Sequence, residues 1–585
     1  SRSMDATVVG AGFFSVWNQL SLDQQLLIKK QSLQMRKRKF PLKSHMINYF
    51  GAIVNAISVE KTDPETFSGY LKVAGQVLQK ATTAQAQQFF SSSRNFFQHH
   101  ALSYDKSFRL YASDDTYSFE YIENIPAETL SWDEPISEAS SSESDNATYE
   151  EEPPPAEYVE ATGDNEFSQE VIPIWMTPPP PPALEGPVIK FDKVSLNFVT
   201  SYDSVYLRDS KGTLSLFQNL FVGEGGSFEW TPAGLGPDSV VCNMSTYFFN
   251  VKKPEVTAEL VKLNYKGKTP GFIPGSFEYK SQTRRDSTFS SFPRFKSYQS
   301  DLLITGLADQ NVRYKGGFSL IGNKVTSGSV AGDPALIEVF QQGEKKFTAQ
   351  SSEFNFEPGN ITSNKAKINI HQGNDSIVHQ LVRMKYVYGS DSTQQLLLQK
   401  DKGDMRNAPY TSTFFNIDFS ADLLRWDLYS DSLNIQIEGA RNTVPLIIES
   451  VDFYDPEDYR LLKGVGFSFH ALALVANYAV QNNVREFYSG DLAQFSKRNP
   501  LEIKQAIEFL RQKGLVNYNG RTDLVQVKQK AIDIYLAHKG EEDYDNVKIH
   551  SVIAHHPNAT INFEKRNMTV RGVEEFDISD SLNVH

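Results

Sequence analysis

The chain contains a single cysteine, Cys242, among its 585 residues. One cysteine cannot form a disulfide within the chain, so a disulfide framework and a cysteine-based zinc site are both excluded. No run of about 18 or more apolar residues occurs, and the sequence therefore predicts no transmembrane helix. A signal-peptide pattern is also absent from the first residues. The start at Ser1, without an initiator Met, and the end just after a strand-like run predict a piece of a longer protein.

Basic residues are outnumbered by acidic ones. Lys and Arg total 58 against 71 Asp and Glu, which gives a formal net charge of −13. A protein coated in nucleic acid needs a basic surface to neutralise phosphates, so nucleic acid is not expected as the main partner. The 585 residues predict at least three domains, because a domain usually takes about 100–200 residues.

The first part of the sequence predicts helices, and the next part predicts none. Residues 1–130 are expected to form a helical bundle with a short β tail. Ser21 and Gln24 have the spacing of a capping box, and Pro64 opens a helix whose apolar residues recur at helical intervals. Residues 131–187 are acidic, serine-rich and proline-rich, and Pro178–Pro182 is an unbroken proline run. We expect a disordered or extended linker there.

Residues 188–464 and 546–585 alternate apolar and polar side chains, a pattern typical of half-buried β-strands. Gly, Asn, Asp and Ser fall between the alternating segments, as expected for turns. The sequence thus predicts a large all-β scaffold, and both a solenoid and a stacked jelly roll remain open. Predicted strands include 195–199, 204–208, 213–217, 227–230, 256–265, 367–371, 433–438, 559–563, 568–573 and 575–578.

Residues 465–545 interrupt the β pattern with a module that resembles a winged helix. Helices are predicted at 471–481, 491–496, 501–513 and 529–538, and strands at 515–518 and 524–527. Asn499 and Glu502 have the spacing of a capping box before the third helix, and Gly514 ends that helix. The Asn519-Gly520 dipeptide between the two strands is a hairpin turn signal. The fold class is therefore multidomain α+β, with a winged-helix-like insert in a β scaffold.

Five short segments stand out in the second half of the chain: Gly373–His379, Asp401–Gly403, Trp426-Asp427, His556–Thr560 and Arg571–Val573. They are similar to segments of very large exported or envelope-associated proteins of Bacteroidota. The similarity extends to the order of features, from helical start through acidic linker to β scaffold and insert. It implies a location in the cell envelope or outside the cell. The family has no assigned activity, so the resemblance implies no site residues.

The insert carries the candidate interaction face, which consists of Lys504, Gln505, Arg511 and Arg521. A winged helix that binds DNA lays its third helix in the major groove, where Gln505 and Arg511 would reach base edges. Glu502 and Glu508 on the same helix would repel phosphates. From 489 to 540 there are nine basic and five acidic residues, a net charge of +4. This mild balance favours a protein-docking or structural role over nucleic-acid binding.

Other patterns point to chemistry only weakly. The acidic group Asp452, Asp455, Glu457 and Asp458 contains ligands that calcium prefers, but Pro456 and the spacing indicate an ordinary acidic turn. The pairs His99-His100 and His555-His556 are adjacent, and neighbouring side chains point apart. No phosphate loop, dinucleotide fingerprint or nucleophile elbow occurs. We therefore expect no cofactor, no metal and no catalytic residue.

The function that the sequence favours is non-enzymatic assembly or interaction in the bacterial cell envelope or the secreted fraction. Its partners would be other envelope proteins, polysaccharide or lipid. Two alternatives stay open. The first is nucleic-acid binding through the insert. The second is a glycan-acting enzyme on the β scaffold, which requires a cleft bringing together two carboxylates of a set of five. These are Asp418, Asp422, Asp427, Asp431 and Glu449.

Overall fold

A computed structural model describes residues 2–123, 180–285, 288–389, 394–400, 408–437, 445–545, 547–552 and 557–577. Most of the predicted linker at 131–187 lies outside the described residues. The described residues form two compact units. One comprises residues within 1–98, 116–192 and 213–222, and the other comprises residues within 99–115, 193–212 and 223–585.

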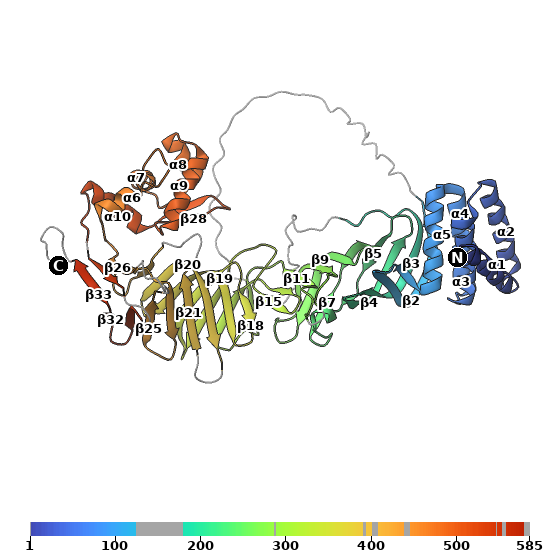
Figure 1. The fold of residues 1–585 in the computed structure, drawn as a ribbon, viewed down its shortest axis with the longest axis horizontal. Coiled ribbons are helices and arrows are strands. Elements are labelled where there is room, and N and C mark those ends of the chain that lie inside the picture. Colours follow the sequence, from blue (N-terminus) through green and yellow to red (C-terminus); the bar gives the residue numbers. More distant parts are fainter. Residues whose placement is uncertain are drawn as a thin grey trace, which may run out of the picture. The chain divides into compact units, whose positions relative to one another are not determined.

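The N-terminal helices account for most of the first unit, and Figure 1 draws them in blue. Their bounds are α1 (Arg2–Trp17), α2 (Leu22–Lys37), α3 (Ile47–Ser58), α4 (Pro64–Lys80) and α5 (Thr83–His99), with a π-helical turn at Leu42–Met46 before α3. The capping box of Ser21 and Gln24 is confirmed. Asp63 caps α4 by accepting hydrogen bonds from the backbone N–H groups of Glu65 and Thr66. A helical start is therefore confirmed, although the sequence did not predict the full length of α1.

Aromatic rings fill the space between these helices. Tyr70 stacks against Phe89 with ring centroids 5.8 Å apart and meets Phe97 edge-on at 5.2 Å. Buried Gln31 donates to the backbone oxygen of Leu71 at 2.6 Å and accepts from the hydroxyl of Tyr49 at 2.7 Å. Because the buried amide and hydroxyl satisfy each other, the apolar core carries no desolvation penalty from them.

The rest of the described chain is dominated by β-strands and includes a closed barrel of six strands with many further strands outside it. The strands are β1 (Ala101–Tyr104), β2 (Phe108–Ile122), β3 (Gly186–Thr200), β4 (Ser204–Ser215), β5 (Leu220–Glu224), β6 (Ser227–Phe228), β7 (Val240–Asn243), β8 (Thr246–Asn250), β9 (Glu255–Tyr265), β10 (Ile273–Lys280), β11 (Arg294–Ser297), β12 (Leu302–Ile304), β13 (Val312–Gly316), β14 (Ser319–Ile321), β15 (Lys324–Thr326), β16 (Ala335–Gln341), β17 (Glu344–Ser351), β18 (Asn355–Glu357), β19 (Asn360–Gln372), β20 (Asp375–Tyr388), β21 (Gln394–Lys400), β22 (Tyr410–Ser412), β23 (Ile417–Phe419), β24 (Leu423–Asp427), β25 (Ser432–Gln436), β26 (Leu446–Ser450), β30 (Lys548–Ser551), β31 (Ala559–Asn562), β32 (Asn567–Val570) and β33 (Val573–Asp577).

From β9 onward the antiparallel pairings form two ladders. The first runs through β9, β10, β11, β14, β15, β18 and β19, and continues through β20, β21, β24, β25, β31 and β32. The second runs through β12, β13, β16, β17 and β19, and continues through β20, β22, β23, β26, β30 and β33. The two long strands β19 and β20 belong to both ladders, and their shared register shifts between Ser363 and Ile368. Figure 1 shows the middle strands of these ladders side by side.

Side chains of the two ladders meet in an apolar interior. Tyr314 of the second ladder contacts Phe356 of the first edge-on, with centroids 5.2 Å apart. Phe347 and Tyr386 make a similar contact at 5.3 Å. Since alternate residues of each strand face this interior, the alternation in the sequence and the burial agree. The prediction of a large β-rich region is confirmed.

A helical insert separates β26 from β30, which are neighbours in the second ladder. Its elements are α6 (Pro456–Leu461), α7 (Ala471–Gln481), β27 (Glu486–Tyr488), α8 (Ser489–Ser496), α9 (Pro500–Gln512), β28 (Val516–Asn519), β29 (Leu524–Val527) and α10 (Gln529–Lys539). The three strands form a separate sheet in the order β27-β29-β28. Ile503, Ala506, Ile507 and Leu510 of α9 are buried in its core, as their spacing predicts.

One local prediction for the insert is wrong. Asn499 caps α9 by accepting from the N–H of Leu501, but Glu502 does not complete a capping box. Its carboxylate accepts from the backbone N–H and hydroxyl of Ser468 instead, so a tertiary contact replaces the local motif. The predicted hairpin turn at Asn519-Gly520 is confirmed, because β28 and β29 pair on either side of it. The Asn519 side chain stabilises the turn by accepting from the N–H groups of Arg521 and Thr522.

Candidate functional site at the root of the insert

Four polar side chains form a row across the second ladder where the insert joins it. Thr411 pairs with Asp418, Asp418 with Glu449, and Glu449 with Lys548, on strands β22, β23, β26 and β30. Residues directly opposite each other in antiparallel strands project to the same face. The row therefore presents two carboxylates and one ammonium group side by side to the insert.

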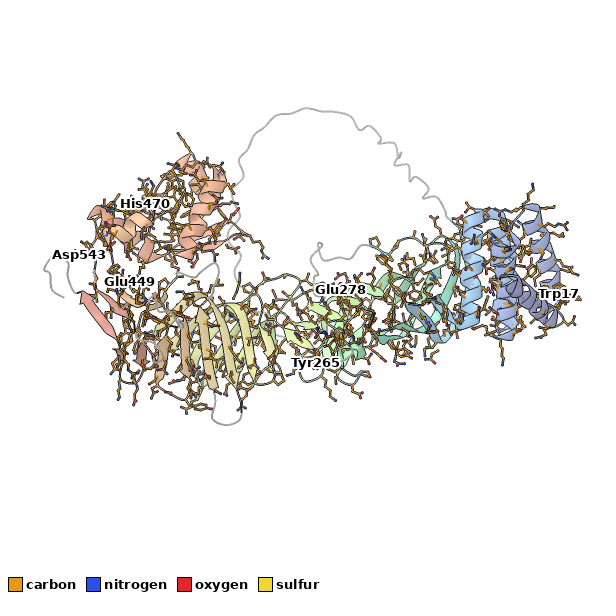
Figure 2. The ribbon with its side chains drawn as sticks, in the orientation of Figure 1. Trp17, Tyr265, Glu278, Glu449, His470 and Asp543 are labelled. Carbon is orange, nitrogen blue, oxygen red and sulfur yellow. The ribbon has the colours of Figure 1, made fainter. Side chains whose placement is uncertain are left out.

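A cavity of about 470 Å³ lies between this row and the insert. All four residues of the row line it, as does the first turn of α10 at Lys528–Lys530. Its remaining wall includes the apolar side chains of Phe419, Ile447, Phe453, Leu462 and Ile534 and the charged side chains of Asp455, Asp458 and Lys513. Figure 2 labels Glu449 on the strand side and His470 within the insert. A concave, mainly apolar space with a few convergent charges is the usual form of a small-molecule site.

Lys530 connects the insert to the row. Its ammonium donates to the Oδ2 atom of Asp418 and lies 3.5 Å from the Oε1 atom of Glu449. Burial would lower the pKa of Lys530, but the charges of Asp418 and Glu449 outweigh it and raise that pKa. The side chain of Asp418 is only 1% exposed, and its Oδ1 atom has no hydrogen-bond partner among the described residues. This buried acceptor is thus left unsatisfied, and it is closed off from solvent.

Lys528 is the second cation of the α10 turn, and its surroundings differ. Burial lowers the pKa of Lys528 to about 8, and Lys367 and Lys530 lower it further against the opposing effect of Asp418. Lys528 also occupies the N-cap position of α10, where no side chain caps the helix. The positive end of a helix disfavours a cation. A half-buried ammonium in this position is electrostatically unfavourable unless an anion joins it.

The other side of the root is a stack of aromatic rings. Tyr459 lies between His470 and His538, at centroid distances of 4.3 and 3.8 Å. The Nδ1 atom of His470 accepts from the N–H of Ala473, so its proton lies on Nε2, which donates to the carbonyl of Tyr459. Burial lowers the pKa of His470. These rings have protein partners on their faces and ring nitrogens, and they serve to fix α6, α7 and α10 together.

The predicted interaction face lies elsewhere, on α9 and the adjoining hairpin. Lys504 forms an ion pair with Asp523 at 2.7 Å, and Arg511 pairs with Glu508 at 2.6 Å. Arg521 lies 3.5 Å from Asp333 of the β scaffold. Gln505 is exposed on α9. The three cations of this face thus already have carboxylate neighbours within the chain.

The acidic turn at 452–458 has a structural role. Asp455 caps α6 by accepting from the N–H groups of Glu457 and Asp458. Glu457 pairs with Arg460, and Asp458 lies 3.4 Å from Lys548. Over the described ranges, no group of three or more His, Cys, Asp or Glu residues is placed to hold a metal ion.

The side chains of His99 and His100 separate in space, and only some of the five candidate carboxylates meet. His99 stacks on Tyr104 at 3.7 Å, and His100 pairs with Asp115 at 2.9 Å, so the two rings face different partners. The pair His555-His556 lies outside the described residues. Asp418 and Glu449 are brought together at the cavity, while Asp422, Asp427 and Asp431 do not line it. The ammonium of Lys530 contacts both Asp418 and Glu449.

Sequence reasoning missed the lysines of the cavity. The prediction used Lys528 and Lys530 only in the net charge of residues 489–540. It did not use Lys548. The sequence does contain a signal that could have identified them. Two lysines, at i and i+2, lie at the start of a predicted helix, where acidic residues are preferred. A cation at that position indicates a partner supplied from elsewhere in the fold.

Helices in the described part of the chain are too short or too polar to cross a membrane. Comparison with models of protein families, with curated proteins and with solved structures finds no match to this chain.

Proposed function

We propose that the chain is a non-enzymatic interaction scaffold of the bacterial cell envelope or secreted fraction. Its partners would be envelope proteins, polysaccharide or lipid. In this proposal the two ladders are a stacked β scaffold, and the insert is a winged-helix-like module. The order α7-β27-α8-α9-β28-β29-α10 and the small sheet β27-β29-β28 support that assignment of the insert.

One observation carries the proposal. The cations on α9 and its hairpin are neutralised within the chain, by the pairs Lys504–Asp523, Arg511–Glu508 and Arg521–Asp333. A helix that binds DNA needs free cations for phosphates, since counterion release supplies most of the affinity. A neutralised face fixed onto a β scaffold is better suited to protein or glycan contacts than to a duplex.

The enzyme alternative has one observation in its favour, the meeting of Asp418 and Glu449 at a cavity. Glycoside hydrolysis needs one protonated and one ionised carboxyl flanking the scissile bond. Here the ammonium of Lys530 contacts both carboxylates. Both carboxylates are thus already engaged by one cation, an arrangement more typical of an internal ion pair than of a catalytic carboxyl pair.

Location is the first test of this function. The native full-length protein is followed by cell fractionation, and intact cells are treated with protease. We expect recovery in the envelope or medium, with cleavage in intact cells for a surface-exposed form. A protein confined to the cytosol would contradict the proposal, and a salt-dependent DNA titration of the whole chain would then test nucleic-acid binding.

A site-specific cross-link then identifies the class of partner. A photoreactive amino acid replaces Gln505, whose exposed side chain has no role in the α9 core. The matched control places the same group at Lys345, on a β-strand far from the insert in sequence. We expect a protein or glycan adduct at position 505 and none at 345. An adduct made only with nucleic acid would contradict the proposal.

A further inference from the structure

We propose that the exposed face of α2 docks onto a membrane surface that contains anionic lipid headgroups. Lipid is one of the partners in the proposed function, so the docking rests on that function to this extent. Vesicle binding is measured on the purified protein, so the docking and the cellular location can fail separately.

The helix α2 turns two glutamines inward and three leucines outward. Its buried residues are Gln24, Ile28, Gln31 and Met35. Gln31 donates to the carbonyl of Leu71 at 2.6 Å, and Gln34 donates to that of Leu78 at 2.9 Å. These amide hydrogen bonds hold α2 against α4, and Figure 1 shows the two helices side by side. The contact with α4 therefore does not use the outward leucines.

Leu22, Leu26 and Leu33 form an apolar stripe on the side of α2 away from its buried residues. Their side chains are 77%, 63% and 61% exposed. Steps of four and seven residues keep them on one side of a helix. Single exposed leucines are normal, but a row of them along one helix face indicates a surface that meets an apolar partner.

Basic side chains border the stripe on both sides. By helical spacing, Lys29 and Arg36 follow one edge of it, and Lys30 and Lys37 follow the other. All four residues are exposed, and none of them forms an ion pair with a carboxylate of the described ranges. Lys29 lies 5.6 Å from the ring centre of Trp17, which Figure 2 labels. Tryptophan is a residue type enriched at membrane interfaces.

Carboxylates near α2 gather at its N-terminal end. Asp23 lies in its first turn. Asp63 and Glu65 are close to that end as well, because Gln24 of α2 contacts the first turns of α4. Near the other end of α4, Glu123 is paired with Lys80. The middle and the C-terminal half of the stripe are therefore bordered by cations that these carboxylates do not neutralise.

The helical region as a whole is basic in an acidic chain. Residues 1–98 contain twelve Lys and Arg and five Asp and Glu, a net charge of +7, whereas the whole chain carries −13. Two copies of the α2 face would repel each other, so a second copy of this chain is disfavoured as the occupant.

An anionic bilayer fits both parts of this face. Leucines on the convex side of a helix can enter the boundary between headgroups and acyl chains, while the bordering cations reach the phosphates. A partner helix would instead require a groove on one of the two surfaces. The combination of an outward apolar ridge and cations on both of its sides thus favours lipid.

Binding is measured by flotation of the full chain with vesicles of phosphatidylglycerol and phosphatidylcholine in equal amounts. Vesicles of phosphatidylcholine alone and soluble polyglutamate are the reference compounds. We expect the mixed vesicles to bind at least about tenfold more tightly than phosphatidylcholine alone, because four cations face the headgroups. Added salt should reduce this difference.

Leucine variants test the apolar stripe. Leu26→Gln combined with Leu33→Gln keeps the charge and the helix propensity, and it should weaken binding by at least about tenfold. The matched control combines Leu303→Gln with Leu501→Gln, at leucines of the second unit that are 72% and 64% exposed. It should bind as the unchanged protein does. Circular dichroism should show the same helix signal in all of these proteins, since each substituted side chain is exposed.

Lysine variants test the charge. Lys30→Gln combined with Lys37→Gln should weaken binding to the mixed vesicles by about tenfold. The matched control is Lys252→Gln combined with Lys324→Gln, two exposed lysines of the second unit. It should leave the affinity unchanged.

A fluorescent label tests insertion directly. Cys242 is the only cysteine of the chain and is buried, so Leu33→Cys supplies the one accessible thiol. An environment-sensitive fluorophore attached there should shift its emission to the blue when mixed vesicles are added. The same fluorophore attached in Leu303→Cys should not shift.

Four results would overturn the docking. They are equal affinity for the two kinds of vesicle, equal effects of the α2 variants and their controls, a dimer in sedimentation that depends on Leu26 and Leu33, and tighter binding to polyglutamate than to the mixed vesicles. The third would assign the face to a second copy of the chain, and the fourth to an acidic polypeptide. An envelope location without vesicle binding would remove the docking and leave the proposed function standing.

Discussion

Lys528 and Lys530 are separated by one residue in the first turn of α10, and both are withdrawn from water. Lys530 contacts the carboxylates of Asp418 and Glu449, whereas Lys528 has no such ion pair within the described ranges. A buried cation with partners holds the structure together, whereas a buried cation without one opposes folding. The same change of side chain should therefore have opposite effects at the two positions.

Lys530→Met is expected to destabilise the second unit by about 3–5 kcal/mol, because Asp418 is left as a buried carboxylate without its partner. Lys528→Met is the matched control. It should leave stability unchanged or raise it by up to roughly 2 kcal/mol, since it removes a desolvated ammonium that is still partly exposed. Urea unfolding at neutral pH measures both. A loss of stability in Lys528→Met as large as in Lys530→Met would contradict this account.

His379 shows how burial sets a protonation state at a single residue. It lies on β20, and its Nδ1 atom accepts from the N–H of Leu381 while Nε2–H donates to the carbonyl of Ala408. Burial lowers the pKa of His379 to about 4, against a small opposing effect of the Ala408 hydrogen bond. Both ring nitrogens are satisfied only in the neutral form, because a protonated ring could not accept from Leu381.

The pH dependence follows from this lowered pKa. The unfolded state takes up a proton near pH 6.5 and the folded state only near pH 4, so the stability from neutral His379 is complete above about pH 6.5. It is lost as the pH falls towards about 4, and the loss amounts to roughly 3 kcal/mol. In His379→Gln, stability should be lower at neutral pH but should fall less on acidification. Denaturant midpoints of both proteins across this range provide the test, and parallel pH profiles would contradict it.

At the scale of elements, the insert has its own core. Buried side chains from α7, α8, α9, α10 and the small sheet form one cluster, with Ile507 and Leu510 fully buried at its centre. The insert leaves and rejoins the second ladder through adjacent strands. Its local unfolding is therefore expected to leave the pairing of β26 with β30 in place.

Ile507→Asp places an unpaired carboxylate in this core and should cost more than about 4 kcal/mol, enough to unfold the insert. Gln505→Asp is the control on the exposed face of the same helix, with an expected change within about 0.5 kcal/mol. Hydrogen exchange should show loss of protection in α7–α10 and retained protection in β16–β26. Retained protection of α9 in Ile507→Asp would refute the assignment of its buried face.

At the scale of the whole molecule, each ladder adds one strand after another along the chain. The insert lies between β26 and β30, two strands that pair with each other. Directly before and after the insert, the backbone N–H of Ser450 donates to the carbonyl of Val547, and Glu449 pairs with Lys548. A chain that returns to the adjacent strand requires no long loop in the scaffold itself. Such an arrangement tolerates loss of the inserted module.

Replacing residues 452–545 by Asn-Gly, a favoured hairpin turn, should leave the scaffold folded. Asp418 and Glu449 would then be hydrated, so the loss of Lys530 would cost little, unlike in Lys530→Met. We expect a β-type circular dichroism spectrum with reduced helix signal and a melting temperature of the scaffold within about 5 °C of the intact chain. Loss of the β signal would show that the ladders require the insert.

Local features of this protein were determined by the sequence alone. The ends of α7, the buried face of α9 and the alternation along β9, β19 and β31 follow from side-chain periodicity and capping, which act over a few residues. Glu502 departed from prediction because Ser468, a partner distant in sequence, competed with the local capping motif.

Only the tertiary structure decided which strands pair and which charges meet. Each ladder pairs strands that are not consecutive in the sequence, so it brings together residues that are far apart in the chain. No local sequence pattern determines the register of such pairs. The row of Thr411, Asp418, Glu449 and Lys548 depends on it, and so does the contact with Lys530. The cavity arises because strand pairing places a helix, which forms from local signals, over charged residues that lie up to 130 positions apart in the sequence.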